Sequence, residues 1–262
     1  MITKRSFLTA ACAALSFAIA APVAQADALS DITAAGVIRI AVPQDFPPFG
    51  SVGTDMKPQG YDIDMANLIA DKMGVKLQMV PVTSANRIPY LQTDKVDLVI
   101  SSMGKNPERE KAIDFSEAYA PFYNGVFAPA DVKIADVADL SGKTIGVTRG
   151  AIEDLELSKI APKDATIKRY EDNAGTISAF LSDQVEAIAT GNVVAASIIA
   201  RNPPRKPEMK FLIKNSPCYV GMNKNEPALT AKVNEIIAGA KADGALDQIS
   251  EKWLGMKLPA EM

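Results

Sequence analysis

The chain alternates short apolar runs with longer segments in which apolar residues recur every three or four positions. The short runs are typical of buried strands, and the longer repeat is typical of amphipathic helices. The stretch 61–73 is the clearest helix, because its apolar residues share one face and Gly74 follows it. The alternation of the two kinds of segment predicts an α/β fold. Strands are predicted at 37–42, 75–82, 96–100, 143–148, 165–170 and 185–190, and helices at 61–73, 84–91 (capped by Ser84), 152–160, 176–181, 228–242 and 246–254.

The predicted elements fall into two sets, the first ending near residue 101 and the second beginning after Asp139. Segments 91–101 and 181–190 are similar, since each has a leucine, a polar turn, a valine with an acid, an apolar strand and a terminal hydroxyl residue. The extended segments 122–129 and 216–222 flank the second set. This arrangement predicts two α/β lobes joined by two hinge strands, with a cleft between them.

A polar stretch at 101–109 follows the apolar run 96–100. Asn106 is a good N-cap and Pro107 suits the first position of a helix, so a helix is predicted to begin here. Hydroxyls, amides and a helix N-terminus beyond the carboxyl end of a parallel strand suit an anion. Arg109 adds a planar guanidinium that can bind a carboxylate through two parallel hydrogen bonds. The stretch therefore predicts a carboxylate site; the alternative is a solvated Arg109 that pairs with a nearby acid.

The first residues read as a secretory signal peptide. Lys4 and Arg5 precede an apolar run at 7–21, and Ala24-Gln25-Ala26 supplies a cleavage site after Ala26. A membrane anchor is the first alternative, but the run is short for a bilayer. Lipidation of Cys12 is the second alternative, although Thr9 stands where a leucine is usual.

Composition narrows the function further. Removal of 26 residues, with two basic and no acidic side chains, leaves 236 residues and changes the formal net charge from −3 to −5. An acidic exported chain is a poor candidate for nucleic-acid binding. The absence of histidine excludes the usual zinc sites and histidine-dependent catalysis. Cys218 would be the one remaining cysteine, so no intrachain disulfide is expected and a small buried hydrophobic role is favoured.

Several short motifs occur in a fixed order along the chain. They are 45–49 (DFPPF), 60–64 (GYDID), the P-E-R, D-F-S and Y residues within 107–119, 221–222 (GM) and 252–254 (KWL). Together they resemble the polar amino-acid-binding family, family 3, of the periplasmic solute-binding proteins of ABC importers. The stretch 83–89 (TSANRIP) is most similar to the glutamate/aspartate-binding branch. The resemblance covers nearly all of the chain after residue 26.

The resemblance implies a type II periplasmic binding fold, in which two lobes close on a ligand like a Venus flytrap. Lobe one would comprise residues 27–123 and 219–262, and lobe two residues 124–218. The ligand would be an amino acid or an amino-acid-like small carboxylate, bound without chemistry, cofactor or metal. A permease in the inner membrane would read the closed form, and the protein would act in the periplasm as a monomer.

The resemblance also implies ligand contacts in lobe one. The matching positions are Phe46, Arg87, Ser101, Ser102, Gly104 and Arg109. Arg109 would hold the main carboxylate and Arg87 a side-chain carboxylate, the alternative for Arg87 being a surface arginine. Phe46 would stack on the ligand or pack in the core. The family often has a serine or threonine at the position of Gly104. A glycine there would offer its amide but no hydroxyl. Asp62 and Asp64 would organise the start of a helix, and Trp253 would be a packing residue.

Lobe two departs from the family pattern. Thr148, Ala151, Asn173 and Asn192 are the matching positions, and Ala151 lacks the family's hydroxyl. The aspartate that pairs with the ligand's ammonium in the family falls on Gly191, beside Asn192, which has no charge. Another acid would then be needed, with Asp45, Glu153 and Asp172 as the candidates. Otherwise the ligand would lack a primary ammonium, as a dicarboxylate or an N-substituted amino acid does.

Two other classes of protein stay open. Exported enzymes of this fold, such as cyclohexadienyl dehydratase, eliminate water from a carboxylated ring and would need Glu153 or Asp172 as a general acid. A sensor domain of a membrane receptor is the other class, and the end of the chain at Met262 is taken as an argument against a fused one.

Overall fold

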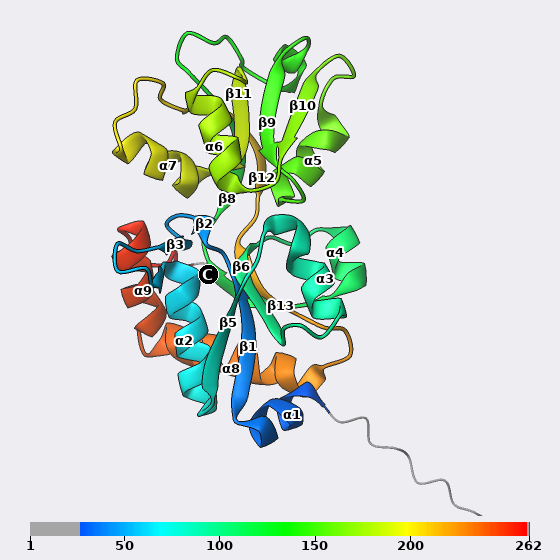
Figure 1. Cartoon of the computed structure of the whole chain (residues 1–262), viewed down its shortest axis with the longest axis vertical. Coiled ribbons are helices and arrows are strands. Elements are labelled where there is room, and N and C mark those ends of the chain that lie inside the picture. The colour runs from blue at the N-terminus through cyan, green and yellow to red at the C-terminus, as the bar shows by residue number, and fades with distance from the viewer. Residues whose placement is uncertain (1–26, 261) are drawn as a thin grey trace, which may run out of the picture.

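The computed structural model describes residues 27–260 and 262, so the predicted signal peptide lies outside the described residues. Two five-stranded sheets, each covered by helices, lie one above the other along the long axis of the molecule (Figure 1). The predicted two-lobed α/β fold is confirmed. We call the first sheet and its helices lobe 1, and the second sheet and its helices lobe 2.

Lobe 1 is built around the sheet order β5-β1-β6-β13-β7. Strands β5, β1 and β6 run parallel, with β5 at one edge of the sheet, whereas β13 is antiparallel to both β6 and β7. The strands are β1 (Val37–Val42), β5 (Lys76–Pro81), β6 (Leu98–Met103), β7 (Asp114–Ala120) and β13 (Cys218–Met222). The helices are α1 (Ala28–Ala35), α2 (Tyr61–Met73), α3 (Arg87–Gln92) after a 3-10 turn at Ser84–Asn86, α4 (Pro107–Ala112), α8 (Pro227–Ala242) and α9 (Ala245–Leu254). A small sheet of β2 (Asp45–Phe46), β3 (Gly50–Val52) and β4 (Pro58–Gln59) follows β1.

Lobe 2 repeats the arrangement in the order β10-β9-β11-β8-β12. Here β10, β9 and β11 are parallel, and β8 is antiparallel to β11 and β12. The strands are β8 (Tyr123–Ala128), β9 (Thr144–Thr148), β10 (Thr166–Tyr170), β11 (Ala187–Gly191) and β12 (Glu208–Asn215). The helices are α5 (Ile152–Ile160), α6 (Asn173–Leu181) and α7 (Asn192–Ala200), with a 3-10 turn at Val137–Leu140.

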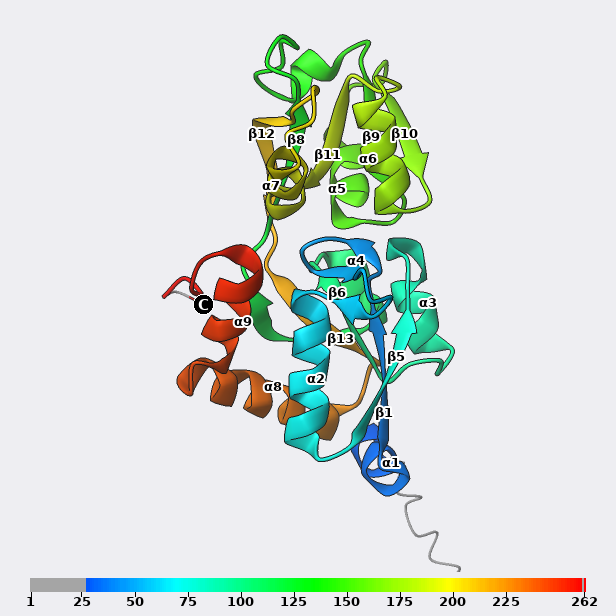
Figure 2. The same cartoon turned by 60° about the vertical axis from the view of Figure 1, so that its left-hand side comes forward.

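The chain passes between the sheets twice, each time through two residues. β7 ends at Ala120 in the first sheet and β8 begins at Tyr123 in the second, while β12 ends at Asn215 and β13 begins at Cys218 back in the first. The amide of Ser216 donates to the carbonyl of Phe122 over 3.0 Å, so the two crossings lie side by side. Figure 2 shows both crossings at one side of the molecule, with α3, α4 and the β2–β3 hairpin facing α5 and α6.

Most predicted elements are present, and the differences have physical causes. β6 continues to Met103, so Ser101 and Ser102 belong to a buried strand and not to a loop. The predicted cap at Ser84 is wrong, because Thr83 precedes the 3-10 turn and makes no capping hydrogen bond. The elements that the pattern missed are α1, β2, β3, β4, β7, β12 and α7.

Cys218 and Trp253, which the sequence predicts to be packing residues, contact the interior of the protein. Cys218 is a buried free thiol, and burial raises its pKa well above the ordinary value. Trp253 packs against the core of lobe 1 and donates its indole N–H to Asp64 over 2.7 Å. Lys252 also donates to this carboxylate, over 2.6 Å, so Asp64 ties α2 to α9. None of the helices that the structure describes combines the length and apolar character that a membrane span requires.

Candidate ligand-binding cleft

Arg109 lies at the junction of the two lobes. Asn106 caps α4 by accepting a hydrogen bond from the amide of Arg109 over 2.9 Å, as the sequence predicts. The guanidinium donates through Nη1 to the carbonyl of Gly104 over 2.7 Å and through Nη2 to that of Gly150, in lobe 2, over 2.9 Å. Burial, and then the charge of Arg87, lowers the pKa of Arg109 to about 10. Two of five guanidinium N–H groups are therefore used, and the others remain for a ligand.

Arg87 is the first residue of α3 and is buried beside Arg109. Its Nε donates to Ser101 Oγ over 3.2 Å, and burial lowers its pKa. This burial excludes the surface-arginine alternative. In the described part of the chain, the ion pairs of arginine are those of Arg39, Arg149, Arg169 and Arg205. The cleft thus holds two buried guanidinium groups that form no ion pair with a described acid, although buried charges are normally paired.

A buried polar network fixes the backbone of Ser102. Its φ is 40°, in the left-handed region, and its amide donates to Asp62 Oδ2 over 2.7 Å. Asp62 Oδ1 accepts from the Tyr119 hydroxyl over 2.6 Å, and the Tyr61 hydroxyl donates to the Tyr119 carbonyl over 2.8 Å. Burial raises the pKa of Asp62 to about 7. Asp62 lies in the first turn of α2, where the sequence placed it, but its carboxylate makes no capping bond there and instead fixes the end of β6.

Gly104 has no room for a side chain. A Cβ atom there would overlap the hydroxyl of Ser216, from the second crossing, and would approach Ile152 Cγ1 to 3.5 Å. Ser216 Oγ is buried and has no hydrogen-bond partner within the described chain. The hydroxyl expected at position 104 from the family pattern is therefore replaced in space by one that is 112 positions away in the sequence.

Phe46 is buried in an aromatic cluster. Its ring centroid lies 6.1 Å from that of Phe49 and 6.3 Å from that of Phe122. Phe122 also fills the space beside Gly191, where a Cβ atom would overlap its ring. The family's aspartate at this position is thus absent from the sequence and is also excluded by the packing.

The end of β9 in lobe 2 carries one hydroxyl pair. Thr148 ends β9, and its Oγ1 lies 2.9 Å from Thr176 Oγ1 on α6. Ala151 is buried and donates its amide to the carbonyl of Thr148 over 3.1 Å. Gly150 lies between them with φ of 71°, so a side chain at this position would be strained.

The two asparagines predicted as ligand contacts bind protein groups in the structure. Asn173 donates Nδ2 to the carbonyl of Asp45 over 2.9 Å, while its Oδ1 is buried without a partner in the described chain. Asn192 Oδ1 accepts from the amide of Tyr123 over 3.1 Å and so links α7 to the start of β8. Asn173 Oδ1 therefore remains available to accept a hydrogen bond from a ligand, whereas Asn192 Oδ1 already accepts one from the protein backbone.

Glu153, the second residue of α5, is also buried. Its exposed fraction is 3%, compared with 5% for Arg87 and 4% for Arg109. Burial raises the pKa of this carboxyl to about 7, against the opposing effect of its own backbone amide and of the two arginines. The cleft therefore combines two buried cations with one buried acid.

Several other buried polar atoms from both lobes have no partner within the described residues. They include Thr83 Oγ1, Ser102 Oγ, Asn173 Oδ1, Thr190 Oγ1, Ser216 Oγ and both amide atoms of Asn124. Native structures contain few such atoms, and a ligand is one way to satisfy them. A pocket of about 230 Å³ is lined by residues of both lobes, including Arg87, Arg109 and Gly150. No cluster of three or more metal-ligating side chains occurs between residues 27 and 260.

A comparison with family models matches residues 38–256 to the bacterial extracellular solute-binding proteins, family 3. The chain belongs to this family. The match spans both lobes and both crossings, which agrees with the motifs that the sequence analysis used.

Known relatives and solved structures are consistent with family membership. The chain is 30% identical over 200 residues to the ABC transporter glutamine-binding protein GlnH of Bacillus subtilis, covering 75% of this chain and 72% of that protein. It is 25% identical over 233 residues to the L-cystine-binding protein TcyJ of Escherichia coli K12, covering 87% and 86%. A cysteine-binding protein from Campylobacter jejuni superposes with a TM-score of 0.83 at 27% identity, over 90% of this chain and 96% of that one. An ancestral amino-acid-binding protein, described as a precursor of cyclohexadienyl dehydratase, gives a TM-score of 0.79 at 30% identity, over 86% and 99%.

Proposed function

We propose that the protein binds an amino acid or an amino-acid-like small carboxylate between its lobes, as the periplasmic substrate-binding component of an ABC importer. The observation that carries this proposal is the pair of buried guanidinium groups of Arg87 and Arg109, neither of which forms an ion pair with a described acid. Charge-assisted, two-pronged hydrogen bonds to carboxylates would satisfy them. Relatives named as glutamine-binding and cystine-binding proteins support an amino-acid ligand.

The two arginines bind different ends of the ligand. Arg109 takes the main carboxylate, because Asn106 and Gly104 hold it at the end of β6. Arg87 takes a second carboxylate or another acceptor on the ligand side chain, because Ser101 fixes its Nε and leaves its terminal nitrogens available. A ligand with two acceptor ends, such as an acidic amino acid, fits this division.

Closure follows from the crossings. Residues 27–123 with 219–262, and residues 124–218, move as two units about the paired crossings, a hinge motion common in binding proteins of this shape. The closed form is what an inner-membrane permease reads. The protein acts as a monomer and reaches the periplasm through the signal peptide at residues 1–26.

Titration calorimetry tests the proposal with the twenty standard L-amino acids, L-cystine, succinate and glutarate. We expect at least one of them to bind with a dissociation constant in the micromolar range or below. Arg109→Ala should weaken that binding by a hundredfold or more, because it removes a charge-assisted contact and leaves the carboxylate unpaired. Arg201→Ala, at the exposed end of α7, is the control and should bind as the wild type does. Unchanged affinity in Arg109→Ala would disprove the carboxylate assignment.

A dehydratase is the second candidate function, and one observation favours it. Glu153 is a buried carboxyl whose pKa burial raises to about 7, which suits a general acid at neutral pH. One solved structure similar to this chain is described as a precursor of cyclohexadienyl dehydratase. Incubation with prephenate or arogenate distinguishes the two functions. We expect no product, and turnover of either compound would replace the binding proposal with the enzymatic one.

A further inference from the structure

The ammonium group of an amino acid needs an acid that the family's usual position does not supply. Gly191 occupies that position, and the ring of Phe122 fills the space beside it. Three other acids border the cleft: Asp45, Glu153 and Asp172. Their hydrogen bonds separate them clearly.

Asp45 and Asp172 both accept hydrogen bonds from backbone amides at the N-terminus of α6. Asp45 Oδ2 accepts from the amides of Asn173 and Ala174 over 2.6 and 3.0 Å. Asp172 Oδ1 accepts from the amide of Gly175 over 2.8 Å. Their charges already stabilise the positive end of a helix, so pairing with a ligand would compete with that role.

Glu153 is in a different situation. The glutamates that form ion pairs in the described chain are Glu108, Glu156, Glu171, Glu186 and Glu235, and Glu153 is not among them. Its neighbour Asp154 accepts from the amide of Gly150 over 3.0 Å and from Arg169 Nε over 2.9 Å. Adjacent acids on one helix therefore differ: Asp154 is paired inside lobe 2, whereas Glu153 is buried near Arg87 and Arg109 without forming an ion pair with either in the described chain.

The location of Glu153 places it at the lobe interface. Gly150, three residues earlier, accepts the hydrogen bond from Arg109, and Ile152 approaches Gly104 of lobe 1. The charged groups close enough to influence the Glu153 carboxyl are Arg87, Arg109 and Asp154. Two of them are the arginines assigned to the ligand's carboxylates, so Glu153 lies near the site at which those carboxylates would bind.

Unsatisfied hydroxyls give independent support for a ligand at this point. Ser102 Oγ and Ser216 Oγ are both buried without a partner in the described chain, and they flank the loop at Gly104 that Ile152 approaches. A bound polar molecule would satisfy them, as buried hydroxyls require.

We propose that Glu153 accepts the ammonium group of the ligand, in place of the family's aspartate, and that the protein therefore takes a primary amino acid. This inference rests on the proposed function and narrows it, since it excludes dicarboxylates and amino acids without a charged primary ammonium as the preferred ligand. Across the cleft, the two arginines face the ligand's acceptor ends and Glu153 faces its cation.

Proton release is a specific consequence. Because burial holds the Glu153 pKa at about 7, part of the carboxyl is protonated at neutral pH, and an arriving ammonium ionises it. Binding of an amino acid at pH 7 should therefore release a fraction of a proton, whereas a dicarboxylate should not cause that release. Calorimetry in two buffers of different ionisation enthalpy measures this quantity.

The decisive variant is Glu153→Gln, which keeps the shape of the side chain and removes the charge. We expect any L-amino acid that binds the wild type to bind this variant at least tenfold more weakly and without the proton release, because a charge-assisted contact is lost. Succinate and glutarate, the deaminated counterparts of L-aspartate and L-glutamate, should bind it no worse than they bind the wild type. Glu156→Gln, on the same helix, is the matched control, since Glu156 pairs with Asn106 and Lys159.

The outcomes separate the two proposals. Wild-type affinity of Glu153→Gln for an amino acid, or tighter wild-type binding of glutarate than of L-glutamate, would overturn the role of Glu153 and leave the proposed function intact. If no amino acid and no dicarboxylate binds the wild type, the proposed function itself fails. Melting temperatures of the two glutamine variants show that both are folded, and Glu153→Asp should restore part of the affinity.

Discussion

Asp62 shows how a residue outside the ligand contacts can shape them. Its two carboxylate oxygens accept from the amide of Ser102 and the hydroxyl of Tyr119, both inside lobe 1. The first bond holds the end of β6 in the left-handed backbone conformation that leaves Ser102 Oγ without a protein partner. Because Asp62 touches no part of lobe 2 in these bonds, we expect its loss to affect stability before it affects closure.

Replacing Asp62 tests this network. Asp62→Ala leaves two buried donors unpaired and should lower the free energy of unfolding by about 2–4 kcal/mol. The pH dependence gives a second signature. The folded pKa of about 7 lies above the unfolded value, so the stability from this group is complete below about pH 4 and is lost as the pH rises through 7. Asp62→Asn cannot titrate, so its stability should fall less between pH 4.5 and 7.5.

Urea unfolding at several pH values measures both effects in the wild type and the two variants. Glu153 also has a raised pKa, but it is common to all three proteins and cancels in the comparison. Parallel stability profiles for the wild type and Asp62→Asn would contradict the buried-charge interpretation of this network.

At the residue scale, the sequence predicts what depends on near neighbours. The N-cap at Asn106 follows from a local motif and is confirmed. The space of Gly104 is filled by Ser216 and that of Gly191 by Phe122, and both replacements depend on contacts between distant segments. No local pattern carries that information. The sequence alone therefore shows that the family's hydroxyl is missing at Gly104 and its aspartate at Gly191, but it does not show which distant residues fill those spaces.

The same division holds for whole elements. α2 was predicted with its bounds because its apolar residues share one face, whereas α7 was missed because the sequence NVVAASIIA is apolar nearly all round. β12 was missed because lysines interrupt its apolar residues, and its pairing with β8 carries two register shifts. Helical periodicity identifies a helix only where one face is buried and the other is exposed to solvent.

The N-terminus of α6 in lobe 2 forms hydrogen bonds with lobe 1. Asp172 caps it from within lobe 2, and Asp45 of lobe 1 accepts from the amides of Asn173 and Ala174. We therefore expect the Asp172 cap to be present in both open and closed forms, and the contact with Asp45 to form only on closure. A carboxylate at a helix N-terminus is favourable, so Asp45 stabilises the closed form specifically.

Two alanine variants separate these roles. Asp45→Ala should weaken binding of the amino acid found by calorimetry by roughly tenfold, because the closed form loses charge-assisted hydrogen bonds. Its free energy of unfolding without ligand should change less than that of Asp172→Ala. The latter removes a local cap and should cost about 1 kcal/mol. Calorimetry and urea unfolding on both proteins give the comparison, and equal losses of affinity would contradict the assignment of Asp45 to closure.

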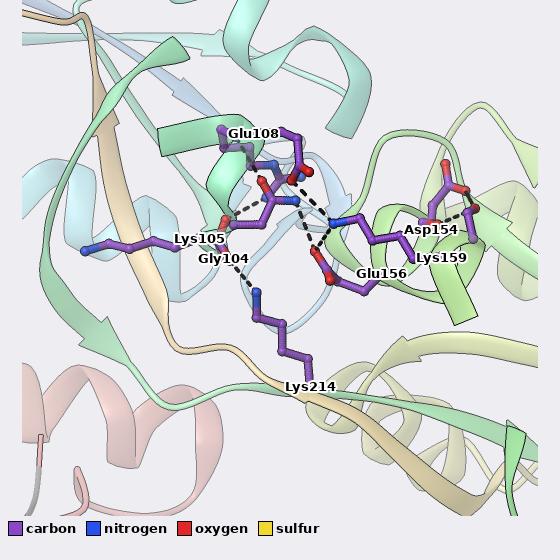
Figure 3. Close-up of polar contacts among 10 residues, drawn as sticks. Gly104, Lys105, Glu108, Asp154, Glu156, Lys159 and Lys214 are labelled. Carbon is purple, nitrogen blue, oxygen red and sulfur yellow. Dashed lines mark hydrogen bonds and ion pairs between the residues drawn. The ribbon is translucent and has the colours of Figure 1, made fainter. Parts of the chain in front are cut away.

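Across the whole molecule, the contacts between the lobes differ greatly in burial. Figure 3 shows the outer set: Lys159 of lobe 2 pairs with Glu108 of lobe 1 and also with Glu156 of its own helix, and Lys214 donates to the carbonyl of Lys105. The lysine pairs are largely exposed, and exposed ion pairs contribute about 0–1 kcal/mol. The contacts of Arg109 with Gly150 and of Asp45 with Asn173 are partly buried, so we expect them to contribute more than the lysine pairs to the balance between open and closed forms.

Close packing of the lobes at one point allows closure itself to be tested. Gly150 of lobe 2 lies against Ala85 of lobe 1, where an added Cβ on the glycine would come within 3.0 Å of Ala85 Cα. Ala85→Trp should hold the lobes apart, because its ring cannot fit in that contact, while each lobe keeps its own core. We expect a melting temperature close to that of the wild type, a larger radius of gyration in X-ray scattering, and no compaction when amino acid is added.

Ala238→Trp is the matched control, since Ala238 is exposed on α8 and faces no part of lobe 2 in the closed form. It should bind ligand and compact as the wild type does. Loss of binding in Ala85→Trp, together with an intact fold, would follow because Arg87 and Arg109 on one lobe and Glu153 on the other no longer reach one ligand. Wild-type affinity in a protein that scattering shows to be open would mean instead that lobe 1 alone holds the ligand, and that the acid of lobe 2 adds nothing to its affinity.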